Sequence, residues 1–173
     1  FIGERSPKQI ILCATDPLSQ EIAAQTTAKI LWYAVDKEIL DDKENKAYVD
    51  ETGALVVDIA GKKEFYGSTD KLQLMGRHNV ENVLATVACA ALYDLPTEKV
   101  GAACQAFTGV EHRLEPVKTM TIEGKTVTFI NDSKATNVEA TLSALRSLEH
   151  EKIVLIAGGR DKHTDLLPLV QQM

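Results

Sequence analysis

The pattern of apolar and polar positions predicts a run of short strands in the first part of the chain. Two apolar runs rich in β-branched residues have the length of buried strands, and Asp16-Pro17 between them is a typical helix start. Glycines at positions 53 and 61 mark the turns of a small antiparallel meander. The expected elements are strands at 8–14 and 29–35, a helix from Asp16, a solvated loop at 36–46, and meander strands at 47–50, 55–59 and 64–66.

Two helices are expected after the meander. Apolar residues recur at helical spacing from His78 to Leu95, and Pro96 is expected to end this helix. A second helix is expected from its cap Thr97 to Phe107, before Gly109 breaks the pattern. The apolar positions expected to face the core are Val80, Val83, Leu84, Val87, Ala88, Ala91 and Leu92 in the first helix, and Val100, Ala103, Cys104 and Phe107 in the second.

Beyond Gly109 the pattern reads strand, helix, strand and helix, which favours a parallel α/β sheet. Thr136 and Glu139 fit a capping box at the start of the first of these helices. We place a boundary between two domains, 1–109 and 110–173, and expect their shared interface to form a site. The expected elements are a hairpin of strands 114–122 and 125–130 around Glu123-Gly124, a helix at 137–148, a buried strand at 152–157 and a helix from about Thr164.

Composition and charge then exclude several classes of protein. The 173 residues carry a net charge of −6 and an isoelectric point near 5.2, whereas a general nucleic-acid binder needs a basic stripe. No apolar run reaches the ~18 residues that a membrane helix requires. Cys13, Cys89 and Cys104 are too few and too scattered for a disulfide framework or a zinc site. We therefore expect three buried thiols in a cytoplasmic protein, with neither nucleic acid nor a membrane among its partners.

Two polar clusters lie at a helix start and at the domain junction. Asn79 and Asn82 are three positions apart, so they share one helix face and could read the edge of a base. A helix cap beside an exposed amide explains the same spacing, and spacing alone favours that explanation. Arg113 would clamp a phosphate, with His112 to orient it, or would pair with a neighbouring glutamate at the surface. The residues by themselves leave these two alternatives for Arg113 even.

Two further clusters follow predicted strands, where α/β proteins bind ligands. N-D-S-K-A-T-N at 131–137 has six polar or charged residues out of seven and precedes a helix start, which favours an anion site. In it, Lys134 would neutralise a phosphate or carboxylate, and Asp132 would hold a ribose hydroxyl or a metal-bound water. A-G-G-R-D-K at 157–162 fits equally a structural glycine turn and a ligand-binding turn in which Lys162 meets an anionic group.

In their order and combination, these clusters resemble the motifs of the Mur ligase family, the ATP-dependent amino-acid ligases of peptidoglycan precursor synthesis. D-S-K-A-T-N at 132–137 looks like the signature of the D-glutamate-adding member. The opening C-A-T-D-P-L is similar to the family's N-x-D-D-P segment, with Cys and Thr in place of two expected residues. The other matches are H-N-V-E-N at 78–82 with H-N-x-x-N, H-R-L-E at 112–115 with H-R-x-E, and A-G-G-R-D-K with G-G-x-D-K.

The resemblance covers essentially the whole chain but only part of the enzyme. It implies that 1–109 is the later half of a central P-loop-type ATPase domain, and that 110–173 is the first half of a Rossmann-like C-terminal domain that binds the amino acid. The sequence contains no G-x-x-x-x-G-K-[ST] phosphate loop, and the magnesium ligands and the carbamylated lysine of the family are expected upstream. We therefore expect the 173-residue chain alone to be inactive, and we expect no metal ligand within it.

The same resemblance implies roles for single residues. Asn79 and Asn82 would face the adenine, and Arg113 and Asp132 would contact the ribose or phosphates of the nucleotide. Lys134, Thr136 and Lys162 would line the pocket for the phosphates and the incoming amino acid. The residues expected to be catalytic are Lys134, Asp132, Arg113 and His112.

The implied activity is that of an ATP-dependent acid–D-amino-acid ligase. It would join D-glutamate to UDP-N-acetylmuramoyl-L-alanine through an acyl phosphate, with ATP and Mg²⁺. We expect the intact protein to be a monomer, and the 173-residue chain to self-associate through strand edges left unpaired. The alternatives are another Mur or folylpolyglutamate-type ligase, which the D-S-K-A-T-N string disfavours, and a non-catalytic nucleotide-binding relative.

Overall fold

The structure is a computed structural model that describes residues 8–74, 76–148, 151–160 and 164–172. The chain separates into two compact units, of which the first ends at Phe107 and the second begins at Thr108. Within the described residues, no helix combines the length and the apolar character needed to cross a membrane. The ligase domains assigned above to 1–109 and 110–173 remain predictions.

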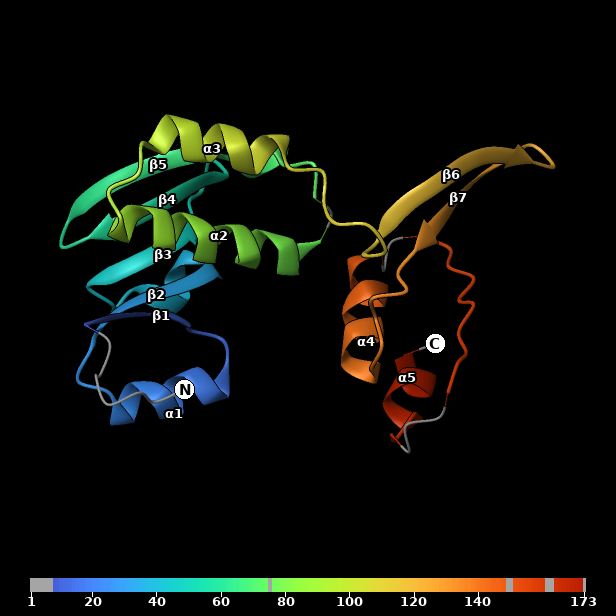
Figure 1. Ribbon diagram of the computed structural model, residues 1–173, viewed down its shortest axis with the longest axis horizontal. Coiled ribbons are helices and arrows are strands. Elements are labelled where there is room, and N and C mark those ends of the chain that lie inside the picture. The colour runs from blue at the N-terminus through green and yellow to red at the C-terminus, as the bar shows by residue number, and fades with distance from the viewer. Residues whose placement is uncertain (1–7, 75, 149–150, 161–163, 173) are drawn as a thin grey trace. The chain divides into compact units, whose positions relative to one another are not determined.

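A mixed five-stranded sheet forms the first unit, in the order β1-β2-β3-β4-β5 (Figure 1). β1 is parallel to β2 and β2 to β3, whereas β3, β4 and β5 are the predicted antiparallel meander. Ala60 and Gly61 both have positive φ at the β4–β5 turn, as a tight two-residue hairpin turn requires. The bounds are β1 Gln9–Cys13, β2 Lys29–Asp36, β3 Asn45–Val49, β4 Ala54–Ile59 and β5 Lys62–Ser68.

Helices cover both faces of this sheet, as the α/β class requires. α2 contacts β2, β3 and β4, and α3 contacts β5, while α1 follows β1 on the other face (Figure 1). As predicted, Asp16 caps α1 by accepting from the backbone N–H groups of Leu18 and Ser19, and Pro17 is the first helical residue. The bounds are α1 Pro17–Gln25, α2 Arg77–Leu92 and α3 Thr97–Ala106, with short 3-10 helices η1 Lys37–Leu40 and η2 Thr69–Lys71.

The core of the first unit follows from the two-residue period of its strands. Leu31 of β2 lies in a cluster with Leu84 of α2, while its neighbour Trp32 lies in a second cluster on the opposite face. The apolar face predicted for α2 is confirmed at its centre, where Val83, Leu84, Val87, Ala88 and Ala91 are all buried.

The predicted solvated loop at 36–46 is partly wrong. Its first residues form η1, and its last residues, Asn45 and Lys46, already belong to β3. Leu40 is completely buried in the core cluster that contains Trp32. The sequence did not reveal the burial of Leu40, because Ile39 and Leu40 stand among charged residues and are too few to show a periodic pattern. One helical turn is nevertheless enough to direct Leu40 into the core.

The predicted helix ends and two predicted core positions also need correction. α2 ends at Leu92, because Asp94 takes a left-handed backbone, and Pro96 lies beyond the helix. Pro96, not Thr97, is the N-cap position of α3. Ala103 and Phe107 are exposed, and the buried residue of α3 is Gly101, since this helix packs through its smallest residue.

The prediction of three buried thiols holds for none of them fully. Cys89 is exposed, and Cys13 and Cys104 are half-buried. Cys89 lies between core residues along α2, but one residue turns a helix by about 100°, so its side chain leaves the buried face. An apolar neighbourhood in sequence therefore overstates the burial of a helical cysteine.

Ionisation of buried tyrosines should make the first unit less stable at alkaline pH. Burial raises the pKa of Tyr33 to about 12, and burial together with the Glu64 carboxylate also raises the pKa of Tyr66. A phenol ionises near pH 10 in an unfolded chain, so this stabilisation is complete below pH 10 and is lost as pH rises toward 12. Urea unfolding between pH 8 and 11 should show the free energy of unfolding fall as the pH rises.

Tyr33→Phe should make this fall shallower, whereas Tyr93→Phe, at an exposed position, should not. The same pH dependence of the free energy of unfolding in both variants and in the unmodified chain would contradict this account.

The second unit contains a two-stranded antiparallel hairpin and two helices (Figure 1). The hairpin is confirmed as predicted, and its turn residues Glu123 and Gly124 both have positive φ. Leu142 is the buried residue of α4. The bounds are β6 Glu115–Ile122, β7 Lys125–Asn131, α4 Val138–Ser147 and α5 Leu167–Gln172.

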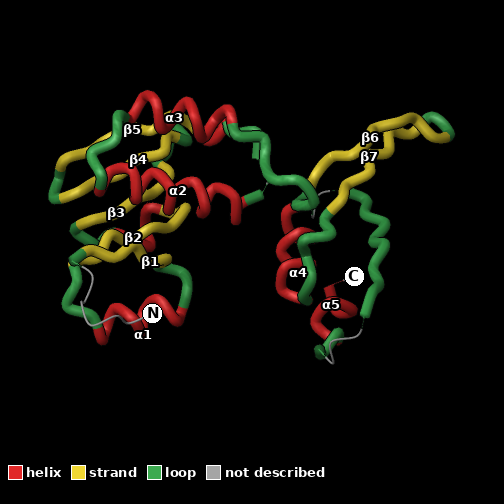
Figure 2. The backbone as a smooth tube through the Cα atoms, viewed as in Figure 1, coloured by secondary structure: helices red, strands yellow, loops and turns green. Residues whose placement is uncertain are grey.

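The buried strand predicted at 152–157 is wrong. Residues 151–160 form no strand, as the loop colour of this segment in Figure 2 shows, and Val154 and Ile156 are 89% and 92% exposed. A strand needs a neighbour for its backbone hydrogen bonds, and among the described residues β6 and β7 pair only with each other, so the segment 152–157 has no partner strand. The parallel sheet expected beyond Gly109 is therefore not formed among the described residues, and α5 starts at Leu167, later than Thr164.

Candidate functional site

The hairpin of the second unit brings two of the four predicted clusters together. In the β6–β7 register Glu115 lies opposite Asn131, so the residues before β6 lie beside those after β7. Two hydrogen bonds join them: the Leu114 N–H donates to Asp132 Oδ1 at 3.1 Å, and the Lys134 N–H donates to the His112 carbonyl at 2.9 Å. H-R-L-E and N-D-S-K-A-T-N, separate in sequence, thus form one structural cluster.

His112 lies at the centre of this cluster. Its backbone N–H donates to Glu115 Oε2 at 2.8 Å, and its ring Nδ1 lies 2.8 Å from Asn131 Nδ2. Its φ of +68° is in the left-handed region, which only a few per cent of non-glycine residues adopt. The sequence analysis considered Glu115 only as a possible surface partner of Arg113 and gave no role to Asn131; their positions at the two facing strand ends were the available signal.

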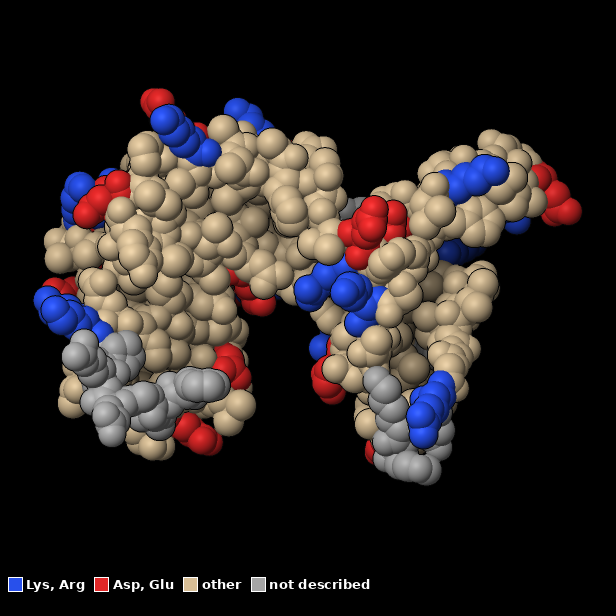
Figure 3. Space-filling view, in the orientation of Figure 1, with Lys and Arg blue, Asp and Glu red and all other residues tan. Residues whose placement is uncertain are grey.

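The two cations of the cluster are exposed. Among the described residues, neither Arg113 nor Lys134 has a side-chain hydrogen bond or ion pair, which removes the predicted alternative of a surface pair between Arg113 and a glutamate. In the face shown in Figure 3, basic and acidic side chains lie next to each other near the base of the hairpin. Positive charge without an internal partner at a loop before a helix is an arrangement suited to an oxyanion ligand.

The start of α4 differs in detail from the predicted capping box. Asn137 is the N-cap, and its Oδ1 accepts from the Ala140 N–H at 2.8 Å. Thr136 is still in the preceding turn, where its N–H donates to the Lys134 carbonyl at 2.8 Å, and its side chain is exposed. The cap moved by one residue because either polar side chain of the Thr-Asn pair can serve, and only the turn decides between them.

Asn79 and Asn82 share the first turns of α2, as their spacing predicted. The Asn82 Nδ2 donates to Asn79 Oδ1 at 3.4 Å, while Asn79 is half-buried and Asn82 exposed. The favoured alternative, in which Asn79 caps the helix, is wrong, because α2 starts at Arg77 with Gly76 as the cap residue. Asn79 is therefore a residue of the first turn of α2 and not its N-cap.

An ion pair that the sequence did not indicate fixes the start of α2. The Arg77 guanidinium donates two hydrogen bonds to the Asp36 carboxylate, of 3.1 and 2.6 Å, from positions 41 residues apart. Hydrogen bonding by Arg77 also holds the pKa of Asp36 below its usual value. The pair ties the helix start that carries Asn79 and Asn82 to the carboxyl end of β2, where ligands bind in parallel sheets.

The opening C-A-T-D-P-L segment has a structural use in this chain. The Asp16 carboxylate accepts from the Ser19 hydroxyl and backbone N–H, at 2.8 and 2.9 Å, and the Ser19 hydroxyl lowers the pKa of that carboxyl. Cys13 Sγ and Thr15 Oγ1 lie 3.1 Å apart. Asp16 is thus engaged as the cap of α1.

The fourth cluster is only partly described. Lys162 lies outside the described residues, as does the aspartate before it. Gly159 has a φ of +131°, which suits glycine alone, and a side chain added at Gly158 or Gly159 would meet nothing within 4 Å. The described residues therefore favour neither of the two alternatives for this cluster, a structural turn or a ligand-binding turn.

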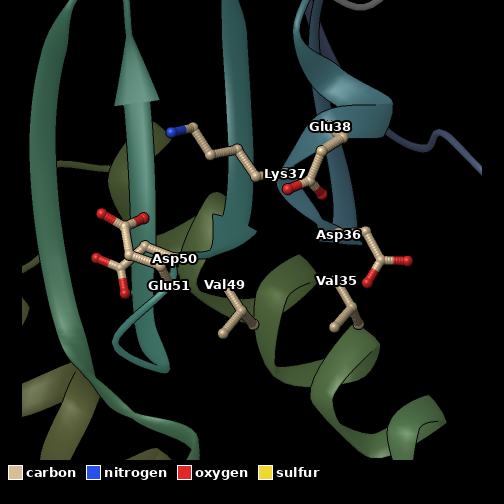
Figure 4. A pocket seen from close by; sticks show the side chains of 7 residues that line it. All are labelled: Val35, Asp36, Lys37, Glu38, Val49, Asp50 and Glu51. Carbon is tan, nitrogen blue, oxygen red and sulfur yellow. The ribbon is translucent and has the colours of Figure 1, made fainter.

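Two hollows lie in the first unit, and one of them is lined in part by Asp36, the partner of Arg77. One, of about 310 Å³, has Asp50 and Glu51 on one side and Lys37 and Glu38 on η1 (Figure 4), and its excess of carboxylates disfavours an anionic ligand. Another, of about 520 Å³, runs along the edge strand β1. The described ranges contain no group of three His, Cys, Asp or Glu residues placed to hold a metal ion, so these residues do not fit a magnesium site.

Comparison with known proteins identifies the relatives of this chain. No family model matches it. It is 36% identical over 161 residues to the UDP-N-acetylmuramoylalanine–D-glutamate ligase of Streptococcus thermophilus, covering 93% of this chain and 33% of that protein. The enzyme of the same name from Koribacter versatilis is 38% identical over 162 residues, covering 94% and 34%.

A solved structure shares the fold of this chain. The structure of MurF from Acinetobacter baumannii superposes with a TM-score of 0.56 at 20% identity, covering 84% of this chain and 30% of that one. The chain thus spans about a third of the length of the relatives it matches. Its sequence homologues and its shared α/β fold together show that the chain belongs to the Mur ligase family.

Proposed function

We propose that the intact protein is an ATP-dependent ligase that joins D-glutamate to UDP-N-acetylmuramoyl-L-alanine in peptidoglycan precursor synthesis. The observation that carries the proposal is the likeness to D-glutamate ligases along 93% of the chain. The D-S-K-A-T-N string within that span supports the choice of amino acid. Because the chain spans a third of those enzymes, the proposal concerns the full-length protein.

The proposed reaction overcomes the poor reactivity of a carboxylate toward an amine. The terminal phosphoryl group of ATP is transferred to the alanyl carboxylate, which yields ADP and an acyl phosphate. The amine of D-glutamate attacks the carbonyl carbon, the bond from that carbon to the phosphate oxygen breaks, and the amine loses a proton. Inorganic phosphate leaves with the electron pair, and an amide bond remains.

We assign the anions of this reaction to the cluster in the second unit. Arg113 and Lys134 are exposed cations without partners among the described residues, so they are available to phosphate and carboxylate oxygens. Asp132 accepts the Leu114 N–H with Oδ1, which fixes its carboxylate and leaves Oδ2 for a ribose hydroxyl. We also assign Thr136 and Lys162 to the pocket for the phosphates and the amino acid, and this assignment rests only on the D-S-K-A-T-N and A-G-G-R-D-K motifs.

We assign the adenine to Asn79 and Asn82 in the first unit. Asn82 uses one amide N–H on Asn79, so its oxygen and its second N–H remain for a ligand. A carboxamide offers a donor and an acceptor side by side, which matches the Watson–Crick or Hoogsteen edge of adenine. ATP is thus the nucleotide we propose, and the Mg²⁺ that accompanies it is expected to be held by parts of the full-length protein beyond this chain.

We place the reaction in the cytoplasm, where ATP is available, and propose a monomer as the active form of the intact protein. Cell-wall formation, and through it cell shape and division, would depend on its product. Small molecules are the only partners that the proposal requires.

The test is phosphate release by the full-length protein with ATP, Mg²⁺ and UDP-N-acetylmuramoyl-L-alanine, with and without D-glutamate. We expect release that requires D-glutamate. Release with another amino acid only would keep the ligase chemistry and discard the specificity. A folded protein that binds nucleotide but releases no phosphate with any amino acid would instead be a non-catalytic relative.

A further inference from the structure

Asn131 has two hydrogen-bond partners at opposite ends of its side-chain amide. The Ser133 backbone N–H donates to Oδ1 at 3.1 Å. Because a backbone N–H can only donate, this bond identifies the amide oxygen and directs Nδ2 to the other side. There Nδ2 lies 2.8 Å from His112 Nδ1. An amide turned by 180° would place Nδ2 against the Ser133 N–H, two donors facing each other.

We propose that Asn131 is a positioning residue that holds the neutral His112 ring in the tautomer protonated on Nε2. The amide Nδ2 is a donor only, so His112 Nδ1 must accept and cannot carry the proton. The competing arrangement is a proton on Nδ1 directed at Glu115 Oε2. Those atoms are 3.7 Å apart, too far for a hydrogen bond, and the oxygen already accepts the His112 backbone N–H.

The backbone of His112 is fixed as firmly as its ring. Its N–H bonds to Glu115 and its carbonyl to the Lys134 N–H, which together maintain the unfavourable left-handed φ. The side chain is 55% exposed, and no described residue pairs with Nε2. The ring therefore offers one N–H donor to a ligand from a fixed position beside Arg113 and Lys134.

The expected partner of this donor is an oxygen of the nucleotide, in a phosphate or the ribose, and this part rests on the proposed function. Arg113 and Lys134 supply the charge there, so the neutral imidazole adds direction to the binding of one oxygen without adding a third positive charge. The tautomer itself does not depend on the identity of the ligand. Asn131 would thus decide which ring nitrogen faces that oxygen.

Nitrogen NMR of the 173-residue chain, labelled with ¹⁵N at histidine and recorded without nucleotide, tests the tautomer. His112→Gln identifies the His112 signals. For the neutral ring we expect Nδ1 at the resonance of an unprotonated nitrogen and Nε2 at that of a protonated one. The opposite pattern in the unmodified chain would overturn the proposal.

Asn131→Asp provides the sharper comparison. It keeps an oxygen for the Ser133 N–H but replaces the donor that faces the ring with an acceptor, so the proton should move to Nδ1 and the two resonances should exchange character. Asn137→Asp is the matched control, because it adds the same charge to the same loop at a cap that an aspartate also serves. Signals unchanged in Asn131→Asp would sink the proposal. The phosphate-release experiment, which uses the intact protein, tests the activity separately.

Discussion

Lys134→Ala in the full-length protein should reduce D-glutamate-dependent phosphate release by about 10²–10³-fold, the loss typical for one preorganised charge or donor at a reaction centre. The side chain of Lys134 is exposed and has no partner among the described residues, so its removal breaks no internal contact. Its backbone N–H, which donates to the His112 carbonyl, is retained by alanine. The turn should therefore survive while the positive charge is lost.

Lys125→Ala is the matched control for this variant. Lys125 is an exposed lysine of the same unit, at the turn of the hairpin, and it lies at the other end of β7 from the cluster. Its replacement should leave phosphate release within about two-fold, which corresponds to the ±0.5 kcal/mol of an ordinary surface substitution. If both variants retained normal turnover, Lys134 would have to be removed from the proposed site.

Gly101→Ala should destabilise the first unit by about 1–3 kcal/mol, the cost of forcing an extra atom into a packed core. A Cβ at this buried position of α3 would lie 2.5 Å from the Tyr66 carbonyl oxygen and 2.9 Å from its carbon, both backbone atoms of β5. In an exposed helix the same change would stabilise by about 1 kcal/mol. The expected sign is therefore opposite to that of helix propensity.

Urea unfolding followed by far-ultraviolet circular dichroism of the 173-residue chain measures this effect. Gly158→Ala is the control, since its Cβ would meet nothing within 4 Å and its backbone is not left-handed. We expect its free energy of unfolding to stay within about 0.5 kcal/mol of the unmodified chain. A Gly101→Ala chain as stable as the unmodified one would show that α3 does not approach β5 this closely.

The parts of the fold that depend on local patterns were predictable. The buried face of α2 follows from helical spacing, and the Glu123-Gly124 hairpin follows from its turn residues. The burial of Leu40 was not predictable, because it depends on a cluster of residues distant in sequence. The exposed conformation of the segment 152–157 was not predictable either, because a strand forms only where a partner strand is available. Local pattern cannot report on either.

The candidate site shows the same division. His112, Arg113, Asp132 and Lys134 could be named from their motifs, and the structure brings their backbones together. The contact of His112 with Asn131 could not be predicted from the motifs, since it depends on the register of β6 against β7. The pair of Arg77 with Asp36 joins residues 41 positions apart, which no spacing rule connects.

The hairpin also determines when the cluster around His112 can form during folding. Its two joining hydrogen bonds connect residues only 18 and 22 positions apart, across a single two-residue turn. Hairpins close in about 1–10 μs, whereas the parallel pair β1–β2 must first build its α1 crossover. The loops around His112 in the second unit can thus assemble early, from one short stretch of chain, before the slower sheet of the first unit is complete.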